Sequence, residues 1–304
     1  MPADLTTLAK LIRETYREPF IEMTTDEKSM LGRFKHTTGR SDAHRWKVHH
    51  GKNTSTTSYG EKDVIGAAGV QSYEEASTPY RQNMVVVEVY GLTEAATAGS
   101  GGFMAAMASE TKAALENLKT SLNDQILANT PAKPTTDLDG IGVILQDTGN
   151  YAGLARTNSW WKPYVLANGG TPRPLSIALM QDMSMTLATP VHRAKVSVIA
   201  TAPAHWYQYG NIFFDLRRYR PGETLDGGFK ALEFEGINII QVPNMATGNM
   251  FFLDESVWEY QVLKDFESEP VATQTDSKKI FIKHYSQLVC LAPARNGRIT
   301  DLSS

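Results

Sequence analysis

Residues 33–80 constrain the fold of this chain most, because they hold few large apolar side chains. They read KHTTGRSDAHRWKVHHGKNTSTTSYGEK from Lys35, followed by DVIGAAGVQSYEEASTPY. A structureless segment of this length is uncommon inside a compact domain. Two explanations therefore remain open: the segment is disordered, or it is an arm that becomes ordered only against another subunit.

The residues that follow this segment carry a clear strand pattern. In MVVVEVYGL, at 84–92, Val85, Val87 and Val89 alternate with other residues and fall on one face of a strand. HRWKVHH, at 44–50, alternates more weakly. We predict that it pairs with 84–92 as the other leg of a long hairpin.

A long amphipathic helix is predicted at about 102–128, after the GSGG of residues 99–102. The residues of one face of this helix, apolar except for Thr111, recur every three or four positions: Met104, Met107, Ala108, Thr111, Leu115, Leu118, Leu122 and Ile126. Pro131 and Pro134 lie just beyond the end, since proline cannot continue a helix. About 26 residues give a rod of roughly 40 Å, against which a sheet can be laid.

The rest of the chain mixes helices and strands. Helices are predicted at 5–22, 175–188 and 204–219, a buried strand at 195–203, and strand-like runs from 228 to 299. The helix at 5–22 has an apolar stripe with no adjacent partner: Leu5, Leu8, Leu11, Ile12, Tyr16 and Phe20. A regular βαβ rhythm is missing, so the predicted fold class is α+β.

Composition excludes several classes of protein. Hydrophobic residues make up 41% and charged residues 21%, which is ordinary for a folded soluble protein. The net charge of −3 argues against wholesale gripping of a nucleic-acid backbone. The single cysteine, Cys290, cannot form an intrachain disulfide and fits a reducing cytoplasm. The sequence contains no run of about 18 apolar residues, so no membrane span is predicted.

The candidate chemical groups do not assemble into a recognisable site. GSGG lacks the Lys-Ser/Thr of a phosphate-binding loop. Asp137 and Asp139 lack the later ligands of a calcium loop, and His205 has no activated nucleophile beside it. The clustered histidines lack metal-ligand spacing, and they are His36, His44, His49 and His50. We therefore predict no catalytic residues, no metal and no cofactor.

A basic run is the stronger candidate for a binding surface. It contains Arg33, Lys35, Arg40, Arg45, Lys47 and Lys52, opposed only by Asp42. Three interpretations remain open: a solvated loop, contact with an acidic surface on a neighbouring subunit, or contact with packaged nucleic acid. Arg217, Arg218 and Arg220 form a second, smaller basic group.

The order of these segments resembles that of phage major capsid proteins of the HK97-like superfamily. The resemblance covers nearly all of the chain and rests on these stretches, taken in order: LIRETYREPFIEMTTDEKSMLGRF, HRWKVHHGKNTSTTSYGEKDVIGAAGVQSYEEASTPYRQNMVVVEVYG, GSGGFMAAMASETKAALENLKTSLNDQILAN, DTGNYAGLARTNSWWKPYV, GGFKALEFEGINIIQVPNMATGNMFFLD, EYQVLKDFESEP and KIFIKHYSQLVCLAPARNGRI.

This resemblance implies a division of the chain. Residues 1–35 would be an N-terminal arm, and 36–95 an extended loop (E-loop) that reaches across a neighbouring subunit. Residues 96–160 and 256–304 would form a peripheral (P) domain around a spine helix at about 102–128, and 161–255 an axial (A) domain. The missing core of 33–80 and the unpartnered stripe at 5–22 would then both be covered by neighbours.

The resemblance also implies a function: hexamers and pentamers of this chain would form an icosahedral head around double-stranded DNA. The implied partners are further copies, packaged DNA bound without sequence specificity, and separate scaffolding, portal and decoration proteins. No membrane is implied, and assembly would occur in the host cytoplasm before release as a virion. We predict subunit contacts at Arg40, Arg45, Lys47, Lys62, Arg156, Arg217 and Arg218.

Three alternatives are kept. An encapsulin-like nanocompartment shares the fold but encloses protein cargo. An α+β enzyme lacks a catalytic constellation here. A surface-decorating or adhesion protein is disfavoured by the long helix and the missing sandwich rhythm of strands.

Overall fold

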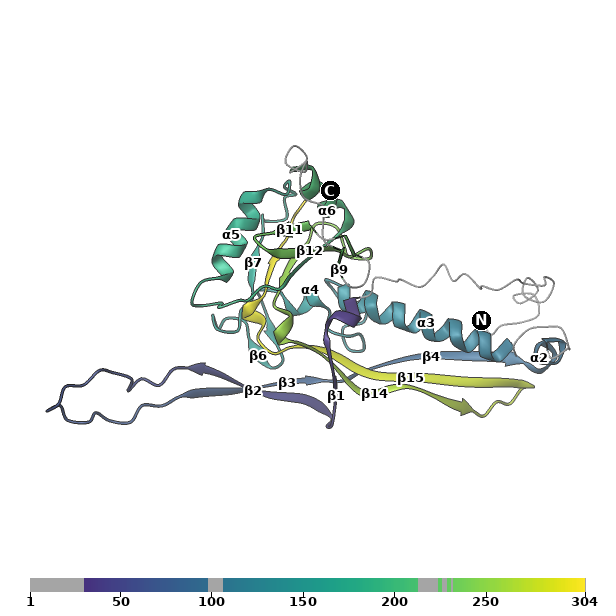
Figure 1. Ribbon diagram of the computed structural model, residues 1–304. Helices are drawn as coiled ribbons and strands as arrows, with labels where there is room; N and C mark the ends of the chain where they lie inside the picture. Colours follow the sequence, from purple (N-terminus) through teal and green to yellow (C-terminus); the bar gives the residue numbers. More distant parts are fainter. Residues whose placement is uncertain (1–29, 98–105, 213–223, 226–228, 231, 304) are drawn as a thin grey trace.

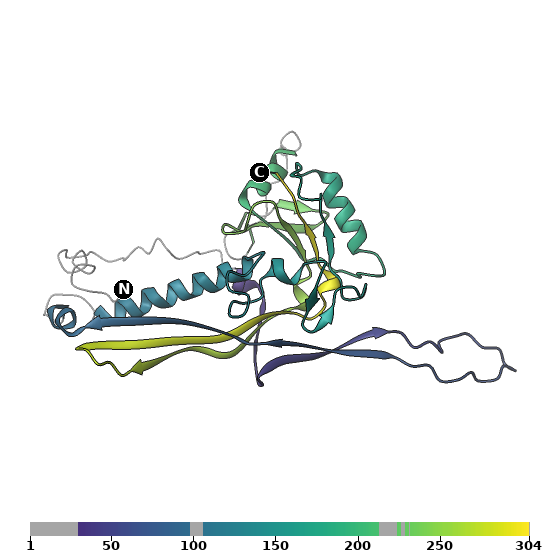
Figure 2. The same ribbon diagram turned by 180° about the vertical axis from the view of Figure 1, so that it is seen from behind.

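The computed structural model describes residues 30–97, 106–212, 224–225, 229–230 and 232–303. Figures 1 and 2 show a compact body beside a layer of long strands. The long helix α3 lies over one end of this layer, and a two-stranded ribbon projects from the other end (Figure 1). The predicted α+β class is confirmed. The predicted helix at 5–22 lies outside the described residues.

The strand layer contains a four-stranded sheet in the order β1-β14-β15-β4. β14 and β15 form a long antiparallel pair, β4 is antiparallel to β15, and β1 is parallel to β14. The bounds are β1 Lys35–Thr38, β4 Arg81–Tyr90, β14 Trp258–Val271 and β15 Ser277–Cys290. The short helices η1 (Met30–Arg33) and α2 (Gly91–Thr97) flank it.

Helix α3 (Ala106–Leu127) lies along one face of this sheet. Leu118, Leu122 and Ile126 are buried, and so are Val87 and Val89 of β4. The helical stripe therefore meets the alternating face of the strand, as the two sequence periods predict. Each such side chain contributes about 1.5–3 kcal/mol when fully buried. The helix ends before Pro131, as predicted, and its predicted first residues, 102–105, lie outside the described part.

The body is built on a six-stranded sheet in the order β11-β12-β8-β13-β16-β7. The bounds are β7 Tyr164–Leu166, β8 Val198–Thr201, β11 Leu232–Phe234, β12 Ile237–Gln241, β13 Met250–Leu253 and β16 Gly297–Ile299. The small pairs are β5 Asn150–Tyr151 with β6 Leu154–Ala155, and β9 Thr224–Leu225 with β10 Phe229–Lys230. The remaining short helices are α4 Ile141–Ile144, η3 Glu255–Val257 and η4 Pro293–Arg295.

Two helices accompany the six-stranded sheet. The helix predicted at 175–188 is α5 (Ile177–Leu187). Ser176 caps its N-terminus, because the Ser176 hydroxyl oxygen accepts the Leu179 N–H at 3.3 Å. The helix packs so closely on β16 that a Cβ at Gly297 would clash with the Met183 sulfur. The helix predicted at 204–219 is described as α6 (Pro203–Ile212), and residues 213–219 lie outside the described part.

The predicted pairing of 44–50 with 84–92 is wrong. β2 (Ala43–Gly51) pairs instead with β3 (Ser72–Pro79), while β4 pairs with β15. Tyr80 alone separates β3 from β4, so one nearly continuous run serves two sheets. The switch follows Pro79, which has no N–H to donate to a further ladder bond. The segment 33–80 therefore contains three strands of its own, and within it only 52–71 forms a long stretch without regular strands.

None of the helices in the described part of the chain is long and apolar enough to cross a bilayer.

Candidate assembly interface

The ribbon consists of β2 and β3 and runs along the underside of the body, and the loop that joins the two strands extends past the body (Figures 1 and 2). Its register runs from Ala43 opposite Pro79 to Gly51 opposite Ser72. Because successive side chains of a strand point to opposite faces, the ribbon has two distinct surfaces. Trp46 and Val48 share the inner face, and Arg45 and Lys47 share the outer face.

The inner face is attached to the body by an aromatic anchor made of Trp46, His50, Trp160 and Trp161. Trp46 donates its indole N–H to the Leu291 carbonyl at 3.1 Å and lies 6.3 Å from the Trp161 ring. His50 stacks on Trp160 at 4.2 Å with an interplanar angle of 8°. Trp161 is buried. The root of the ribbon is therefore ordered by its own chain, without a neighbour.

The outer face is polar and exposed. Arg45 donates to Asp42 at 3.2 Å, and Lys47 lies opposite Glu75 in the ladder. His49 stacks on Tyr73 at 4.8 Å. Surface pairs of this kind add little to the stability of a subunit, but their mixed charges can select a partner.

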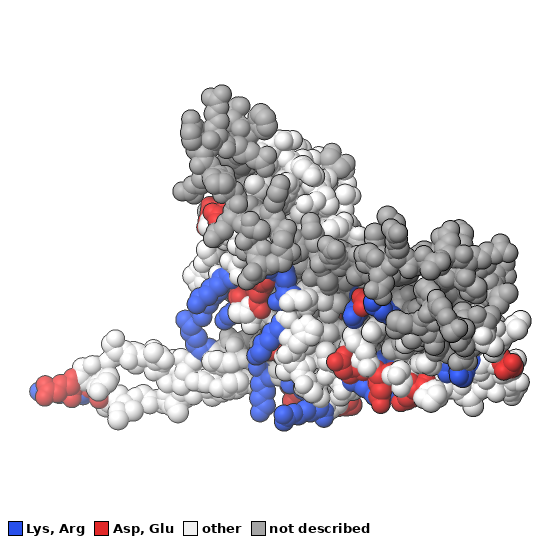
Figure 3. Space-filling view, turned by 45° about the vertical axis from the view of Figure 1, so that its right-hand side comes forward, with Lys and Arg blue, Asp and Glu red and all other residues white. Residues whose placement is uncertain are grey.

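The tip loop, residues 52–71, carries the clearest unsatisfied surface. Its large apolar side chains are almost fully exposed: Tyr59 82%, Val64 93%, Ile65 94% and Val70 76%. Between Lys52 and Glu74 the only charged residues are Glu61, Lys62 and Asp63, and Figure 3 shows charge at the tip with a largely uncharged surface behind it. Exposed apolar groups gathered in one loop are typical of an interaction site.

The sheet face turned away from α3 is a second exposed surface. Met84 and Val86 of β4 are 66% and 44% exposed. Beside them runs a row of ion pairs. The pairs are Lys264–Glu267, Lys264–Glu269, Lys283–Glu269 and Lys279–Glu88. The hydrogen bond from Lys283 lowers the pKa of Glu269.

Four of the predicted contact residues lie on or beside the ribbon. Arg40 precedes β2, Arg45 and Lys47 lie on its outer face, and Lys62 lies in the tip loop; all four are exposed. The structure therefore gathers them on one projecting element. Arg217 and Arg218 lie outside the described residues.

Arg156, in contrast, is only 3% exposed. It donates to the carbonyls of Thr148, Val143 and Ile144 at 2.8–2.9 Å, and its guanidinium lies 5.8 Å from the Tyr151 ring centre. Burial lowers its pKa. Because these bonds are made inside its own chain, Arg156 holds the turn after α4 and is not part of an accessible contact surface.

The surface that the predicted residues omit is the apolar one. Val64, Ile65 and Val70 sit in VIGAAGV, which is too short and too rich in glycine to indicate a helix or strand. The one sequence feature that could have indicated this surface was the occurrence of large apolar residues in an otherwise polar segment.

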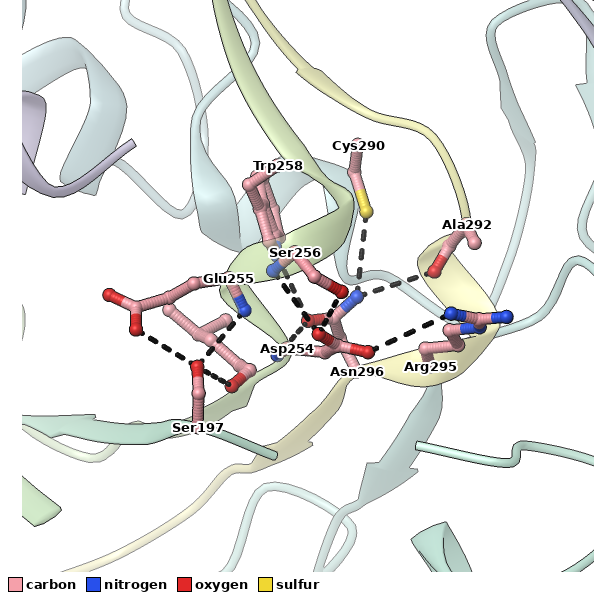
Figure 4. Close-up of polar contacts among 10 residues, drawn as sticks. Ser197, Asp254, Glu255, Ser256, Trp258, Cys290, Ala292, Arg295 and Asn296 are labelled. Carbon is pink, nitrogen blue, oxygen red and sulfur yellow. Dashed lines mark hydrogen bonds and ion pairs between the residues drawn. The ribbon is translucent and has the colours of Figure 1, made fainter. Parts of the chain in front are cut away.

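A buried polar cluster joins the two sheets (Figure 4). Asn296, which is fully buried, accepts the Asp254 N–H and the Trp258 indole N–H, each at 2.9 Å. It donates to the Ala292 carbonyl at 3.3 Å. Asp254 in turn accepts the Ser256 N–H at 3.2 Å and caps η3. The cluster therefore fixes the passage from β13 to β14 and from β15 to β16.

This cluster does not have the character of a catalytic site. Burial raises the pKa of the Cys290 thiol, whereas a nucleophilic cysteine needs a lowered one. Its Sγ lies 3.5 Å from the Asn296 amide. His205 is buried elsewhere, with Nδ1 3.0 Å from Gln208 and Nε2 accepting the Gly248 N–H at 2.9 Å, so it is a structural histidine. In the described residues no three His, Cys, Asp or Glu side chains form a possible metal site.

A family model described as SU10 major capsid protein matches residues 74–303 of the chain, three quarters of its length. No curated protein matches the sequence.

Solved structures give the same fold. The capsid asymmetric unit of cyanophage A-1(L) has a TM-score of 0.72 at 16% identity, covering 94% of this chain and 96% of that one. The capsid of a native GTA particle gives 0.68 at 9% identity, with 97% and 96% covered. The SrpI encapsulin of Synechococcus elongatus PCC 7942 gives 0.64 at 10% identity, with 100% and 96% covered. At these identities the likeness shows the fold alone.

Proposed function

We propose, from the premise that this chain belongs to the SU10 major capsid protein family, a specific way in which its copies build the shell. The chain is a capsid protein, and its fold is that of HK97-like shells. The proposal concerns which surfaces join the copies and what they enclose.

The ribbon carries the proposal. Its tip loop holds apolar side chains that are 76–94% exposed, while its root is fixed by the aromatic anchor. Covering one such side chain contributes about 1.5–3 kcal/mol, so burial of the loop against a neighbouring copy would favour assembly. In the proposal each ribbon reaches across the neighbouring subunit, and Arg40, Arg45, Lys47 and Lys62 select its position there.

The division of the chain follows from the two sheets. The four-stranded sheet with α3 forms the proposed peripheral domain, and the six-stranded sheet forms the proposed axial domain at the centre of hexamers and pentamers. The pairing of β16 with β13 and β7 supports a wider axial domain than 161–255. In the proposal, this domain also includes residues 297–303. Residues 1–35 form the proposed arm.

The contents and partners follow from the same role. The shell encloses double-stranded DNA without reading its sequence, which fits a chain of net charge −3. Scaffolding, portal and decoration proteins are separate partners, and assembly takes place in the host cytoplasm. The role is structural rather than enzymatic. An encapsulin-like role is less favoured, since the encapsulin likeness concerns the fold and the family match names a capsid protein.

Negative-stain electron microscopy tests this proposal on protein expressed alone and together with the scaffolding protein of its genome. The wild type is expected to form shells. The double variant Val64→Ser/Ile65→Ser is expected to remain as unassembled subunits or small rings. The exchange variant Val64→Ile/Ile65→Val, which keeps the loop apolar, is the matched control and is expected to form shells. Shells of the serine variant in wild-type yield would contradict the role of the tip loop.

A further inference from the structure

A pocket opens beneath α3, where the N-terminal end of the described chain meets the long β14–β15 pair. Its volume is about 260 Å³. Its walls come from η1, β1, α3, β14 and β15, through Leu31, His36, Leu122, Tyr260, Phe266 and His284. Glu116 and Lys119, which pair at 2.8 Å, also line it and are partly exposed.

The pocket suits an apolar occupant. Phe266 stacks on His284 at 4.2 Å with an interplanar angle of 13°. The Tyr260 hydroxyl donates to Ser286 at 2.7 Å and lies 2.9 Å from His284 Nε2. His36 Nε2 lies 3.1 Å from the Leu31 carbonyl. Because these atoms have partners in their own chain, the walls offer mainly ring faces and aliphatic carbons to an incoming group, and the one buried nitrogen of His284 without a hydrogen bond, Nδ1, lies 3.7 Å from Asp265.

The undescribed N-terminal segment joins the structure at this pocket. The Met30 N–H donates to Asn123 Oδ1 at 2.9 Å, and Leu31 lines the pocket. Upstream, Phe20, Ile21 and Met23 are the nearest large apolar residues, seven to ten positions before Met30, and polar TTDEKS lies between. Ten residues span at most about 36 Å, so these side chains are within reach.

We propose that Phe20–Met23 dock in this pocket of their own chain. A cavity of roughly 150 Å³ lined by apolar side chains holds a benzene molecule, so this pocket has room for a phenyl ring. The same chain is the occupant because a short tether gives an effective concentration in the millimolar range. The docked segment fixes where the arm leaves the subunit. The rest of the stripe, Leu5 to Tyr16, then remains for other contacts.

Trypsin digestion of unassembled full-length subunits tests the docking, because Arg17 and Lys28 flank the segment. When opening is fast, cleavage tracks the population of the open form. Cleavage after Lys28 is expected to be roughly tenfold faster in Phe20→Ser/Ile21→Ser/Met23→Ser than in the wild type. The matched control, Leu5→Ser/Leu8→Ser/Leu11→Ser, changes as many apolar residues outside the docked segment and is expected to cleave at the wild-type rate.

A variant on the pocket side makes the test reciprocal. Thr120→Trp fills the pocket from α3 and is expected to raise the cleavage rate as the segment variant does, with no further increase when the two are combined. Equal rates in the wild type and both variants would overturn the proposal. Protection that disappears on dilution would also overturn it, since a second copy would then be the occupant. Because the subunits are unassembled, the result does not depend on whether shells form.

Discussion

At the scale of single residues, Asn296 connects more of the molecule than any neighbour in the cluster of Figure 4. Its Oδ1 satisfies two donors, the Asp254 N–H and the Trp258 indole, and both residues are buried. A buried donor that loses its acceptor costs about 1–3 kcal/mol. The carbonyl of one side chain therefore holds η3 and the start of β14 against η4.

Asn296→Ala is expected to lower the free energy of unfolding by about 3 kcal/mol, because it leaves two buried donors without an acceptor. Urea denaturation followed by tryptophan fluorescence measures the change. Asn168→Ala is the control, since Asn168 is exposed and its side chain donates to the Thr171 carbonyl. A loss no larger than that of the control would show that the cluster is not a stabilising joint.

His284 predicts a dependence of stability on pH. Burial lowers its pKa to about 4, against the opposing effect of Asp265 and reinforced by His36. The unfolded chain, with the usual pKa of about 6.5, therefore binds a proton more readily than the folded one. Stability is fully present above pH 6.5 and falls as the pH drops towards 4, by at most about 3 kcal/mol from this residue.

The measurement is the urea midpoint of unassembled subunits at pH 7.5 and pH 5. His284→Gln cannot titrate, so its midpoint is expected to fall less between the two pH values than that of the wild type. Burial also lowers the pKa of His44, so part of the pH dependence remains in the variant. An identical pH dependence in both proteins would exclude His284 as its source.

Residue-scale prediction from the sequence failed where tertiary contacts decide. Arg156 was predicted to lie at a subunit contact, but its side chain is only 3% exposed. Three backbone carbonyls from the turns around α4 surround it instead, and nothing local in the sequence places them there.

At the scale of elements, the sequence predicted those helices and strands whose formation depends on residues close to one another in the chain. The stripe of α3 is set by residues three and four apart, and its end by Pro131, so it could be read from the sequence. The partner of β2 could not. SYEEASTP carries no alternation of apolar residues, and β3 forms because Trp46 and His50 hold β2 against tryptophans more than a hundred positions away.

This dependence gives a prediction for the ribbon. Trp46→Ala removes the bond to Leu291 and the contact with Trp161, so the root of the ribbon is expected to open more often. Hydrogen exchange of Ala43–Gly51 and Ser72–Pro79 should accelerate. Tyr73→Ala is the matched control, since Tyr73 is 60% exposed and stacks on His49, which lies on the outer face of the ribbon and not in the anchor. Exchange in the root that is unchanged in Trp46→Ala would mean that the anchor is dispensable.

At the scale of the whole molecule, the proposal assigns folding and assembly to different residues. The apolar side chains beneath α3 and around the six-stranded sheet are buried by residues of the same chain. The large apolar side chains of the tip loop are not buried by their own chain. This explains why residues 33–80 looked incompatible with a compact domain: about half of them fold against their own chain, and the remainder presents apolar surface outward. A sequence pattern reports burial without saying whether the burying surface is on the same chain or on another copy.

The separation can be tested by removing the loop. Replacing residues 52–71 with Asn-Gly joins β2 to β3 through a tight turn, in which Asn-Gly supplies the positive φ angles required. The urea midpoint of the shortened subunit is expected to stay within error of the wild type, because the loop's large apolar side chains are exposed. Shells are expected to be absent under the electron microscope. Shells with a normal yield would assign assembly to the sheet face of Met84 and Val86 instead, and a large fall of the midpoint would make the loop part of the fold.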